Sequence, residues 1–586
     1  MNVNRFSGIA SGMDTESMVK EMMRVQRVRA DKYYQSRETN NWRQEQYNDV
    51  NKDFANFILD VTKEFGVERK SFGSLIGDTS NLTWVKKAAS SNEDIFTAKG
   101  TSKAPTGTHK IRVERLAEGV SVASSGKIET TSGTFITGQT KISELQGFGG
   151  SGSFEINGKE ITVDESTTIN SLIQQINTGT IDHDNNPNTP EISIGIQASF
   201  DYMQGRLFLS TKGTGKNAQI KVQELDAGGN PKDPTWMKDI FKLSDEIFSE
   251  NGKTGQDAII DFDGAEGLEY SSNQFTINGI EVNLKAADPS KEYTIGVDTD
   301  VDEVYNKIKF FVDKYNELID KMNKKTSEKR YRTFQPLTKE QRDAMKENDI
   351  KLWEQKAKSG LLRGDEHINR TLQNMRSGLY ESVYEQYDPD KGIEENKENL
   401  LSGFNQLTKI GIKTGEWKDK GKLVIDDIKL KEAIREDVDG VLNLLFKPSS
   451  VTSETEGMDD SWSDAQKSEY KTKKRQQMRK ESGLMNRLFD DVITGMKDIV
   501  NKAGTGENAS IYRDVKANLL IDFVTKMGSI SHIDKDTLDL EKKMTNEEKR
   551  LVQVEQRYWD KFTAMEKALS KMQSQSSWVA QQLGGM

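Results

Sequence analysis

The sequence predicts an α+β fold of several domains, in which α-helical, coiled-coil-like legs formed by both termini carry inserted β-rich head domains. Two observations predict this class. Near both ends of the chain, apolar residues recur every three or four positions, which is the period of an amphipathic helix. Between about residues 88 and 300, short runs of alternating apolar and polar residues are separated by Gly, Ser, Thr and Asn, which is typical of strands and turns.

The first long helix is expected to begin after Asp14, a good N-cap residue, and to end near Gly66. Met18, Met22 and Val25 fall on one face of it. After a polar middle, apolar residues return three and four positions apart, at Tyr47, Val50, Phe54, Phe57 and Val61. This spacing fits a coiled-coil seam. It fits equally well an amphipathic helix that lies on its own domain, and the segment alone does not decide between the two.

Six runs in the middle of the chain predict strands: HKIRVERL, GSFEINGKEITV, EISIGIQASF, GRLFLST, AQIKVQEL and NQFTINGIEVNL. Ile156–Val163 and Ile277–Leu284 are near repeats, and each places Asn-Gly between alternating apolar positions, the strongest short-range signal for a β-hairpin. A short amphipathic helix, capped by Gly179, is expected after the first hairpin. The middle is therefore predicted to be a pair of compact β-rich modules.

Helix is predicted to return at Asp298, with an apolar stripe formed by Val301, Val304, Ile308, Phe311, Tyr315, Leu318 and Met322. In the polar region that follows, NDIKLWEQKAKSGLL is the clearest helix. The segment LLSGFNQLTKIGIKTGEWKDKGKLVIDDIKLKEAI predicts strand, turn, strand and helix. The charge-dense stretch from about 449 to 480 is expected to be a loop or mobile segment, because it has few apolar residues.

The last helical segment carries the longest regular apolar stripe of the chain: Leu551, Val554, Tyr558, Phe562, Met565, Leu569, Met572, Val579 and Leu583. Its intervals are three or four residues except the last but one, which is seven and contains the polar Ser576. Such a stripe is typical of a coiled-coil seam. Only a few residues follow it, so nothing local is available to cover it, and we expect it to be an assembly surface.

These patterns divide the chain into six predicted segments. They are N-terminal leg helices at 1–87, the first part of a β-rich head domain at 88–138, an inserted β-rich outer head domain at 139–256, the second part of the head domain at 257–297, a mixed helical and β stalk domain with charged insertions at 298–482, and C-terminal leg helices at 483–586.

Composition narrows the function. Only 34% of the 586 residues are hydrophobic and the mean hydropathy is -0.74, which favours extended, high-surface architecture over one large core. The 83 basic and 93 acidic residues are spread diffusely, which argues against a nucleic-acid binder. Cysteine is absent, so disulfides and thiolate chemistry are excluded. No apolar run approaches the length of a membrane span, so the protein is not expected to be membrane-embedded.

The N-terminus lacks the charged region and apolar run of a signal peptide. The plain reading is a cytoplasmic protein. The alternative is export by a machine that reads an unstructured N-terminus and passes an unfolded chain, a route that a cysteine-free sequence suits.

Signals for catalysis and metal binding are weak. The four histidines are scattered, and none has a second histidine at metal-ligand spacing: His109, His183, His367 and His532. Residues 182–188 resemble part of a calcium loop, but Pro187 stands where Gly is required and Ser193 replaces the bidentate acid. A phosphate-loop reading fails at Ser210 and at Asn217. Alternating acidic residues at 298–303 precede a predicted helix. Negative charge at a helix N-terminus interacts favourably with the helix dipole, so these residues need no metal ion to explain them. We therefore predict no enzyme, no cofactor and no metal, and disfavour a hydrolase hidden in the β modules.

Several segments together resemble the flagellar hook-associated protein 2 family, the filament cap proteins. FSGIASGMDTESMVKEMM is similar to the opening of that family and RQEQYNDVNKDF to its next helix. GTHKIRVERLAEGVSVAS is similar to its first strand region, and INGKEITV with TTINSLIQQIN to a motif of flagellin and hook proteins. FFVDKYNELID and YWDKFTAMEKALSKMQSQSSWVAQQL are similar to its C-terminal domain. The resemblance is loose at about 180–260 and 449–480.

The resemblance implies a secreted protein at the distal tip of the bacterial flagellar filament, exported by the type III apparatus. It implies a homo-oligomeric ring of about five or six subunits that promotes folding and insertion of flagellin. It also implies hook-filament junction proteins, an export chaperone and, in some bacteria, host mucin as partners. The alternative function is a surface adhesin whose β-rich head binds glycans or mucin. Trp236 is its candidate sugar-stacking platform, although burial of this tryptophan inside the module is the favoured interpretation.

The predicted assembly interface follows from the apolar stripes and from the resemblance at both ends. In the N-terminal leg it comprises Met18, Met22, Val25, Tyr47, Val50 and Phe54. In the C-terminal leg it comprises Tyr558, Trp559, Phe562, Met565, Leu569, Trp578 and Leu583. These side chains are expected to be buried against the other terminus, a neighbouring subunit or flagellin helices.

Overall fold

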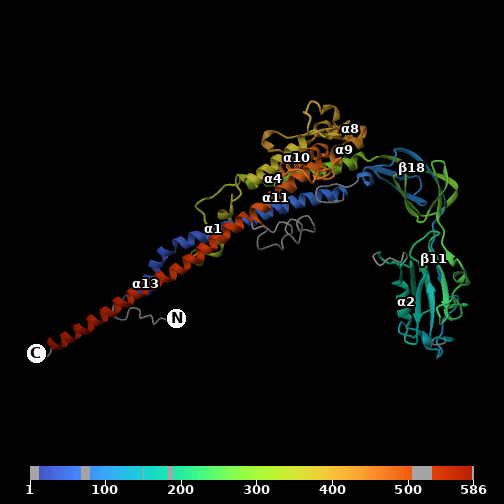
Figure 1. The fold of residues 1–586 in the computed structure, drawn as a ribbon, viewed down its shortest axis with the longest axis horizontal. Helices are drawn as coiled ribbons and strands as arrows, with labels where there is room; N and C mark the ends of the chain where they lie inside the picture. Colours follow the sequence, from blue (N-terminus) through green and yellow to red (C-terminus); the bar gives the residue numbers. More distant parts are fainter. Residues whose placement is uncertain are drawn as a thin grey trace. The chain divides into compact units, whose positions relative to one another are not determined.

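The computed structural model describes residues 12–67, 79–148, 151–182, 189–226, 228–504 and 531–583. The chain divides into two compact units (Figure 1). One combines Met1–Thr79 with Val301–Met586 and is mainly helical, and the other is Ser80–Asp300 and is mainly β-sheet. Helices at both termini and an inserted β-rich middle confirm the predicted α+β class. The six finer segments remain a prediction.

The helical unit contains ten described α-helices and one β-hairpin. The helices are α1 (Thr15–Phe65), α4 (Val301–Ser327), α5 (Lys339–Asp343), α6 (Glu347–Lys358), α7 (Glu366–Tyr380), α8 (Asp427–Glu436), α9 (Val438–Phe446), α10 (Asp464–Glu481), α11 (Leu484–Ala503) and α13 (His532–Leu583). The hairpin pairs β19 (Ile412–Thr414) with β20 (Leu423–Ile425). The helix predicted over 348–362 is confirmed as α6, except that it ends at Lys358 and residues 359–362 form turns. The strand, turn, strand and helix predicted within 400–434 are confirmed as β19, β20 and α8.

The limits of α1 confirm the two predicted signals. The Asp14 side chain accepts a hydrogen bond from the backbone N–H of Ser17 at 2.9 Å, which satisfies one of the free donors at the helix start. At the other end, Gly66 has a φ of 65°, a left-handed conformation that glycine adopts without steric cost.

The core of the helical unit lies around the second half of α1. The Phe57 ring packs against Phe311 of α4, with centroids 6.5 Å apart, and against Phe489 of α11, at 6.1 Å. Phe65 packs edge-to-face on Phe446 of α9 at 5.0 Å. The predicted apolar stripe of α4 faces this core and is buried from Val304 to Met322.

The expectation of a loop or mobile segment at 449–480 is wrong for its second half, which forms α10. Ser463 and Gln466 make a capping box at its start. Lys473 then forms ion pairs with Asp390 and Glu469, and Arg479 forms a two-point pair with Asp491. Contacts with other parts of the chain therefore stabilise a helix that has almost no apolar face.

The β-rich unit contains an antiparallel sheet of eight strands in the order β15-β14-β3-β18-β1-β2-β17-β16. Their limits are β1 (Lys86–Ser90), β2 (Phe96–Gly100), β3 (Gly107–Arg115), β14 (Ala258–Phe262), β15 (Ala265–Tyr270), β16 (Gln274–Ile277), β17 (Ile280–Leu284) and β18 (Asp288–Thr299). One face packs into a core that includes Phe96, Ile111, Ile260 and Ile295.

A second core in the same unit is built from residues 120–247. It is covered by the sheet β4-β10-β9, the sheet β12-β5-β6 and the helices α2 and α3. The limits are β4 (Ser121–Ala123), β5 (Gly152–Ile156), β6 (Lys159–Val163), α2 (Ile169–Asn177), β9 (Ile196–Asp201), β10 (Arg206–Thr211), β12 (Val222–Leu225) and α3 (Trp236–Asp239). Four two-residue strands complete the unit: β7 (Thr180–Ile181), β8 (Ile192–Ser193), β11 (Gln219–Ile220) and β13 (Lys253–Thr254).

Both predicted Asn-Gly hairpins are confirmed. Asn157 and Gly158 join β5 to β6, and Asn278 and Gly279 join β16 to β17, with positive φ at all four residues. The prediction for α2 is slightly wrong, because Thr178 is its C-cap and Gly179 follows the cap. Two predicted runs are each split into two strands, one of them at Gly195, whose φ of 73° breaks the extended backbone.

Candidate assembly interface of the terminal helices

The candidate functional surface is the pair formed by α1 and α13. Figure 1 shows α13, in red, running beside α1, in blue. Gln26 of α1 contacts Arg550 and Tyr558, whereas Gln44 contacts Asp534. The partner numbers fall as the α1 numbers rise, so the two helices are antiparallel. The residues in contact are more than 480 positions apart in the sequence. The two helices can therefore pack together only when both ends of the chain are present.

An apolar cluster joins the two helices near the start of α1. Val19 and Met23 of α1 are buried against Leu551, Val554 and Trp559 of α13. Ala30, Tyr558 and Phe562 lie at its edge, half-buried. Among the described residues the cluster is small and contains side chains from these two helices, so its apolar burial provides limited stability compared with the core around Phe57.

Polar contacts beside the cluster set the register of the pair. The Arg550 guanidinium donates to the Gln26 side chain at 3.2 Å and to the Gln26 carbonyl at 3.3 Å. It also pairs with Glu547, whose side chain is 7% exposed. Farther along, the Gln44 amide donates to Asp534 at 2.8 Å and to the Ala503 carbonyl. Because these bonds use directional groups on both helices, a shift of one helix along the other would break them.

The end of α13 continues past the paired region. Glu566 is the last buried residue of the helix, and from Lys567 to Gln581 every side chain is exposed except that of Leu569, which is partly exposed. At 1.5 Å per residue, the helix from Lys567 to Leu583 spans about 25 Å. We call these residues, 567–583, the overhang. Trp578 is 62% exposed and Met572 64% exposed, so the overhang presents large apolar side chains to solvent.

The structure separates the predicted residues of the N-terminal leg into two groups. Met18, Met22 and Val25 are exposed, at 40%, 40% and 72%. Tyr47, Val50 and Phe54 are buried within the helical unit. The Tyr47 hydroxyl contacts Asp365 at 2.5 Å, and burial, followed by this hydrogen bond, raises the Tyr47 pKa. Whether any of these residues contacts another subunit stays a prediction.

The predicted residues of the C-terminal leg lie along α13 with decreasing burial. Trp559 is buried, Tyr558 and Phe562 are half-buried in the same cluster, and Met565 and Leu569 are partly exposed. Trp578 is exposed in the overhang. The Leu583 side chain lies outside the described residues, although the helix extends to that position.

Sequence reasoning missed the α1 residues that α13 covers, Val19 and Met23. They lie one position after Met18 and Met22 and have the same spacing of four. The sequence therefore offers two neighbouring apolar faces of α1, and either one has the spacing needed to pack on α13. Sequence reasoning also missed the Gln26–Arg550 contact. Val19 directly follows Met18, and both side chains are apolar. Nothing local in the sequence therefore shows which of the two packs on α13 and which is exposed to solvent.

The alternatives for catalysis and adhesion gain no support from the described residues. Within them, no group of three or more His, Cys, Asp or Glu side chains is placed to hold a metal ion. Trp236, the sugar-stacking candidate of the adhesin alternative, is buried, with its ring packed between Phe148, Phe154 and Phe241. It is a core residue, which confirms the favoured interpretation of this tryptophan, and the stacking platform of the adhesin alternative is wrong. His183 and residues 184–188 of the considered calcium loop lie outside the described residues.

None of the described helices has both the length and the apolar character that crossing a bilayer requires.

Comparisons with known proteins find matches at both ends of the chain. A family model for the flagellar hook-associated protein 2 N-terminus matches residues 11–119, and one for the flagellar hook-associated protein 2 C-terminus matches residues 255–574. The flagellar hook-associated protein 2 of Halalkalibacterium halodurans is 27% identical over 602 residues, which cover 97% of this chain and 98% of that protein. The lateral flagellar hook-associated protein 2 of Vibrio parahaemolyticus is 31% identical over 253 residues, 40% of this chain and 50% of that protein.

Among solved structures, the D1, D2 and D3 domains of the flagellar cap protein from Escherichia coli match with a TM-score of 0.40 and 19% identity. The match covers 69% of this chain and 90% of that one.

Proposed function

Because the chain belongs to the flagellar hook-associated protein 2 family, we infer that it is a structural protein of the bacterial flagellum that caps the distal end of the filament. The family match covers residues 11–119 and 255–574, which include both helical ends as far as residue 574 and, in the β-rich unit, residues 80–119 and 255–300. The function is therefore assembly, in which the capping chain promotes folding and insertion of exported flagellin.

The observation that carries this function is the exposed apolar surface of the terminal helix pair. Two methionines and a valine of α1 and the side chains of the overhang face solvent on helices that are otherwise packed. Large exposed apolar side chains in a regular stripe are typical of a surface that another protein covers. We propose Met18, Met22 and Val25 with Leu569 and Trp578 as contacts to neighbouring subunits or to flagellin.

The partners follow from the same role. The chain acts as a homo-oligomer, in a ring of about five or six copies, because a cap must close around the filament axis. Flagellin is the second partner, since its helices pass beneath the cap as the filament grows. Hook-filament junction proteins and an export chaperone are further partners that the family membership supports. We propose that the buried residues Tyr47, Val50 and Phe54 anchor α1 in the core of the helical unit and so fix the position of the terminal helix pair.

The test is a substitution that removes the stripe of the overhang without shortening the helix. A triple variant, Leu569→Ser, Met572→Ser and Val579→Ser, is compared with a matched control, Ser570→Ala, Ser574→Ala and Ser577→Ala, on another face of the same helix. We expect the stripe variant to stay folded by circular dichroism but to lose ordered oligomers in electron microscopy. In cells that lack the native gene, it should also release flagellin into the medium instead of extending filaments.

The control variant should form oligomers and filaments at the wild-type yield. Filaments of normal length with the stripe variant would contradict the role of the overhang. A full-length chain that stays monomeric at all concentrations, with and without flagellin, would contradict the cap function itself.

A further inference from the structure

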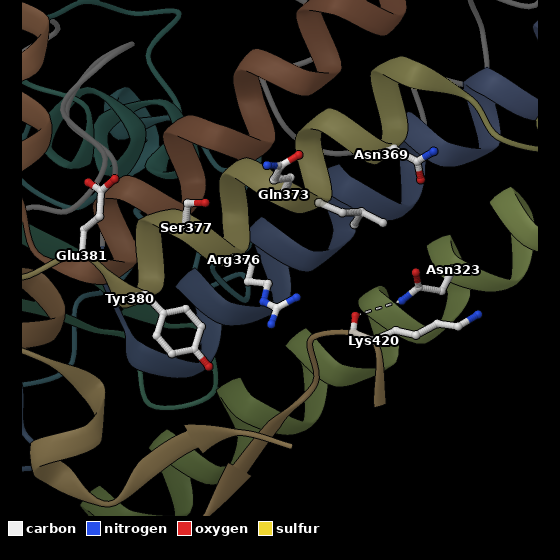
Figure 2. Close-up of a pocket in the computed structure, with 9 residues that line it drawn as sticks. Asn323, Asn369, Gln373, Arg376, Ser377, Tyr380, Glu381 and Lys420 are labelled. Carbon is white, nitrogen blue, oxygen red and sulfur yellow. Dashed lines mark hydrogen bonds between the residues drawn. The ribbon is translucent and has the colours of Figure 1, made fainter. Parts of the chain in front are cut away.

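A groove on the helical unit lies between one face of α7 and the turn that joins β19 to β20. Its volume is about 760 Å³. Figure 2 shows Arg376 and Tyr380 projecting from α7 toward the side where α4 carries Asn323 and the turn carries Lys420. Leu372 adds an apolar contact on the same face of α7. The groove therefore combines a hydrocarbon surface with two cationic side chains and, at one end of α7, the carboxylate of Glu381.

Glu381 also lines the groove, but its carboxylate pairs with Lys480 at 3.1 Å and with Arg479 at 3.7 Å, so it is not paired with either of the two cations. Neither the Arg376 guanidinium nor the Lys420 ammonium makes a hydrogen bond or ion pair with another described residue, and both side chains are exposed. The Lys420 backbone is left-handed, with a φ of 50°, which is costly for a lysine. Asn323 donates to its carbonyl at 3.4 Å and helps to hold it there. Lys242, the other left-handed lysine in the described chain, instead uses its ammonium within the chain, on the Lys127 carbonyl.

A complementary projection lies on the same unit, in the loop at residues 388–396. Ile393 is 65% exposed at its tip, and Glu394 and Glu395 follow it. Asn396 holds the loop from inside, because its fully buried side chain donates to the Asp388 carbonyl at 2.9 Å and accepts from the Asp388 N–H at 2.9 Å. Further bonds reach the carbonyls of residues 391 and 392. Glu394 pairs with Lys397 at 2.5 Å. The loop thus presents the apolar side chain of Ile393 and the carboxylate of Glu395 in a fixed conformation, which lowers the entropy cost of binding.

We propose that the 388–396 loop of one copy of this chain docks into the α7 groove of a neighbouring copy. Ile393 covers Leu372 and Tyr380, and Glu395, which has no ion pair with another described residue, faces Arg376 and Lys420. Ile393 is exposed within its own chain, so the loop does not fill the groove of the same copy. The contact joins two different surfaces and is heterologous, so it generates a ring or a helical array rather than a closed dimer. The inference rests on the proposed function, because it requires the chain to oligomerise.

A charge swap tests the contact in the full-length chain. R376E and E395R each place like charges at the interface, so we expect either substitution to weaken self-association by about tenfold or more in sedimentation equilibrium. The chain that carries both substitutions restores an opposite pair and should recover most of the loss. R435E, on the exposed face of α8, is the matched control and should leave self-association unchanged.

The absence of cysteine allows a direct test by disulfide formation. Chains with Ser377→Cys and chains with Ile393→Cys are mixed and oxidised. We expect a covalent dimer in the mixture at several times its yield with either chain alone. Wild-type oligomers without this dimer and without charge-swap rescue would overturn the proposal while leaving the cap function intact. Single reversals that weaken only flagellin binding would also overturn it. Failure of the wild-type chain to oligomerise at all would overturn both.

Discussion

The two halves of α1 bury similar side chains in very different surroundings. From Tyr47 to Phe65 the helix is surrounded by α4, α9 and α11, and its apolar residues are almost fully buried. From Thr15 to Ala30 it has one described apolar partner, α13, and large apolar side chains remain exposed on another face. We call residues 47–65 the base of α1 and residues 15–30 its tip. The apolar side chains of the base are buried within one chain, whereas part of the apolar surface of the tip is buried on α13 and part is exposed to solvent.

The largest expected effect is at the base. Phe54 is fully buried, so Phe54→Ala should lower the free energy of unfolding of the helical unit by about 3–5 kcal/mol, from lost transfer energy and the cavity left behind. Chemical denaturation followed by circular dichroism measures this. Val25→Ala is the control at the tip, and its exposed side chain should change stability by about 0.5 kcal/mol or less. Equal effects of the two substitutions would contradict the difference between base and tip.

Trp559→Ala tests the tip cluster. The side chain is 9% exposed and packs on one neighbouring helix, so we expect a loss of about 1–3 kcal/mol that is confined to the paired helices. Hydrogen exchange read by mass spectrometry should show faster exchange at residues 15–30 and 545–565 and unchanged exchange around Phe57. If residues near Phe57 lose protection as well, the tip and the base form one cooperative unit.

A smaller effect is expected at the contact between Arg550 and Gln26, which sets the register of α1 and α13. Arg550→Met keeps most of the aliphatic stem but removes the bonds to Gln26 and leaves the Glu547 carboxylate without its cation. We expect a loss of about 1 kcal/mol in the stability of the helix pair. The double variant with Glu547→Gln should recover part of it, because no buried charge is then left unpaired. No recovery would show that Glu547 is stabilised by other groups.

The smallest effect concerns pH at the start of α1. The hydrogen bond from the Ser17 hydroxyl, and then that from its backbone N–H, lower the pKa of Asp14 below its ordinary value of 3.8. A carboxylate with a lowered folded pKa adds stability above its unfolded pKa, and this is lost as the pH falls through the folded pKa. The first turn of α1 should therefore exchange its amides faster at a pH well below 3.8 than at pH 5, after correction for intrinsic rates. Asp14→Asn also caps the helix but does not titrate, and should remove this dependence.

The parts of the fold that were predictable from the sequence depend on local signals. Asp14 and Gly66 mark the limits of α1, and the two Asn-Gly pairs mark hairpins, because each acts through its own backbone conformation. The hairpin at Asp263 and Gly264, which has the same positive φ values, was not predicted, since the residues after it include another glycine and few apolar positions.

What the sequence could not decide depends on contacts between distant residues. The choice of Val19 and Met23 over Met18 and Met22 as the covered face is made by α13, more than 500 positions away, and both stripes have the same spacing. Likewise α10 has the composition of a loop, and its helix depends on partners such as Asp390 and Asp491. Of the proposed assembly surface, the apolar stripes were predictable from the sequence, but the residues that hold the two helices in register were not.

The antiparallel register of α1 and α13 ties the lengths of the two chain ends to each other. The contacts of Gln26 with Arg550 and of Gln44 with Asp534 enclose eighteen steps on one helix and sixteen on the other. An insertion or deletion in one of these spans would move every later apolar residue away from its partner unless a change of similar length, close to a whole number of heptads, occurred in the other. The first and last segments of the gene are therefore expected to change length together, although more than 400 codons separate them.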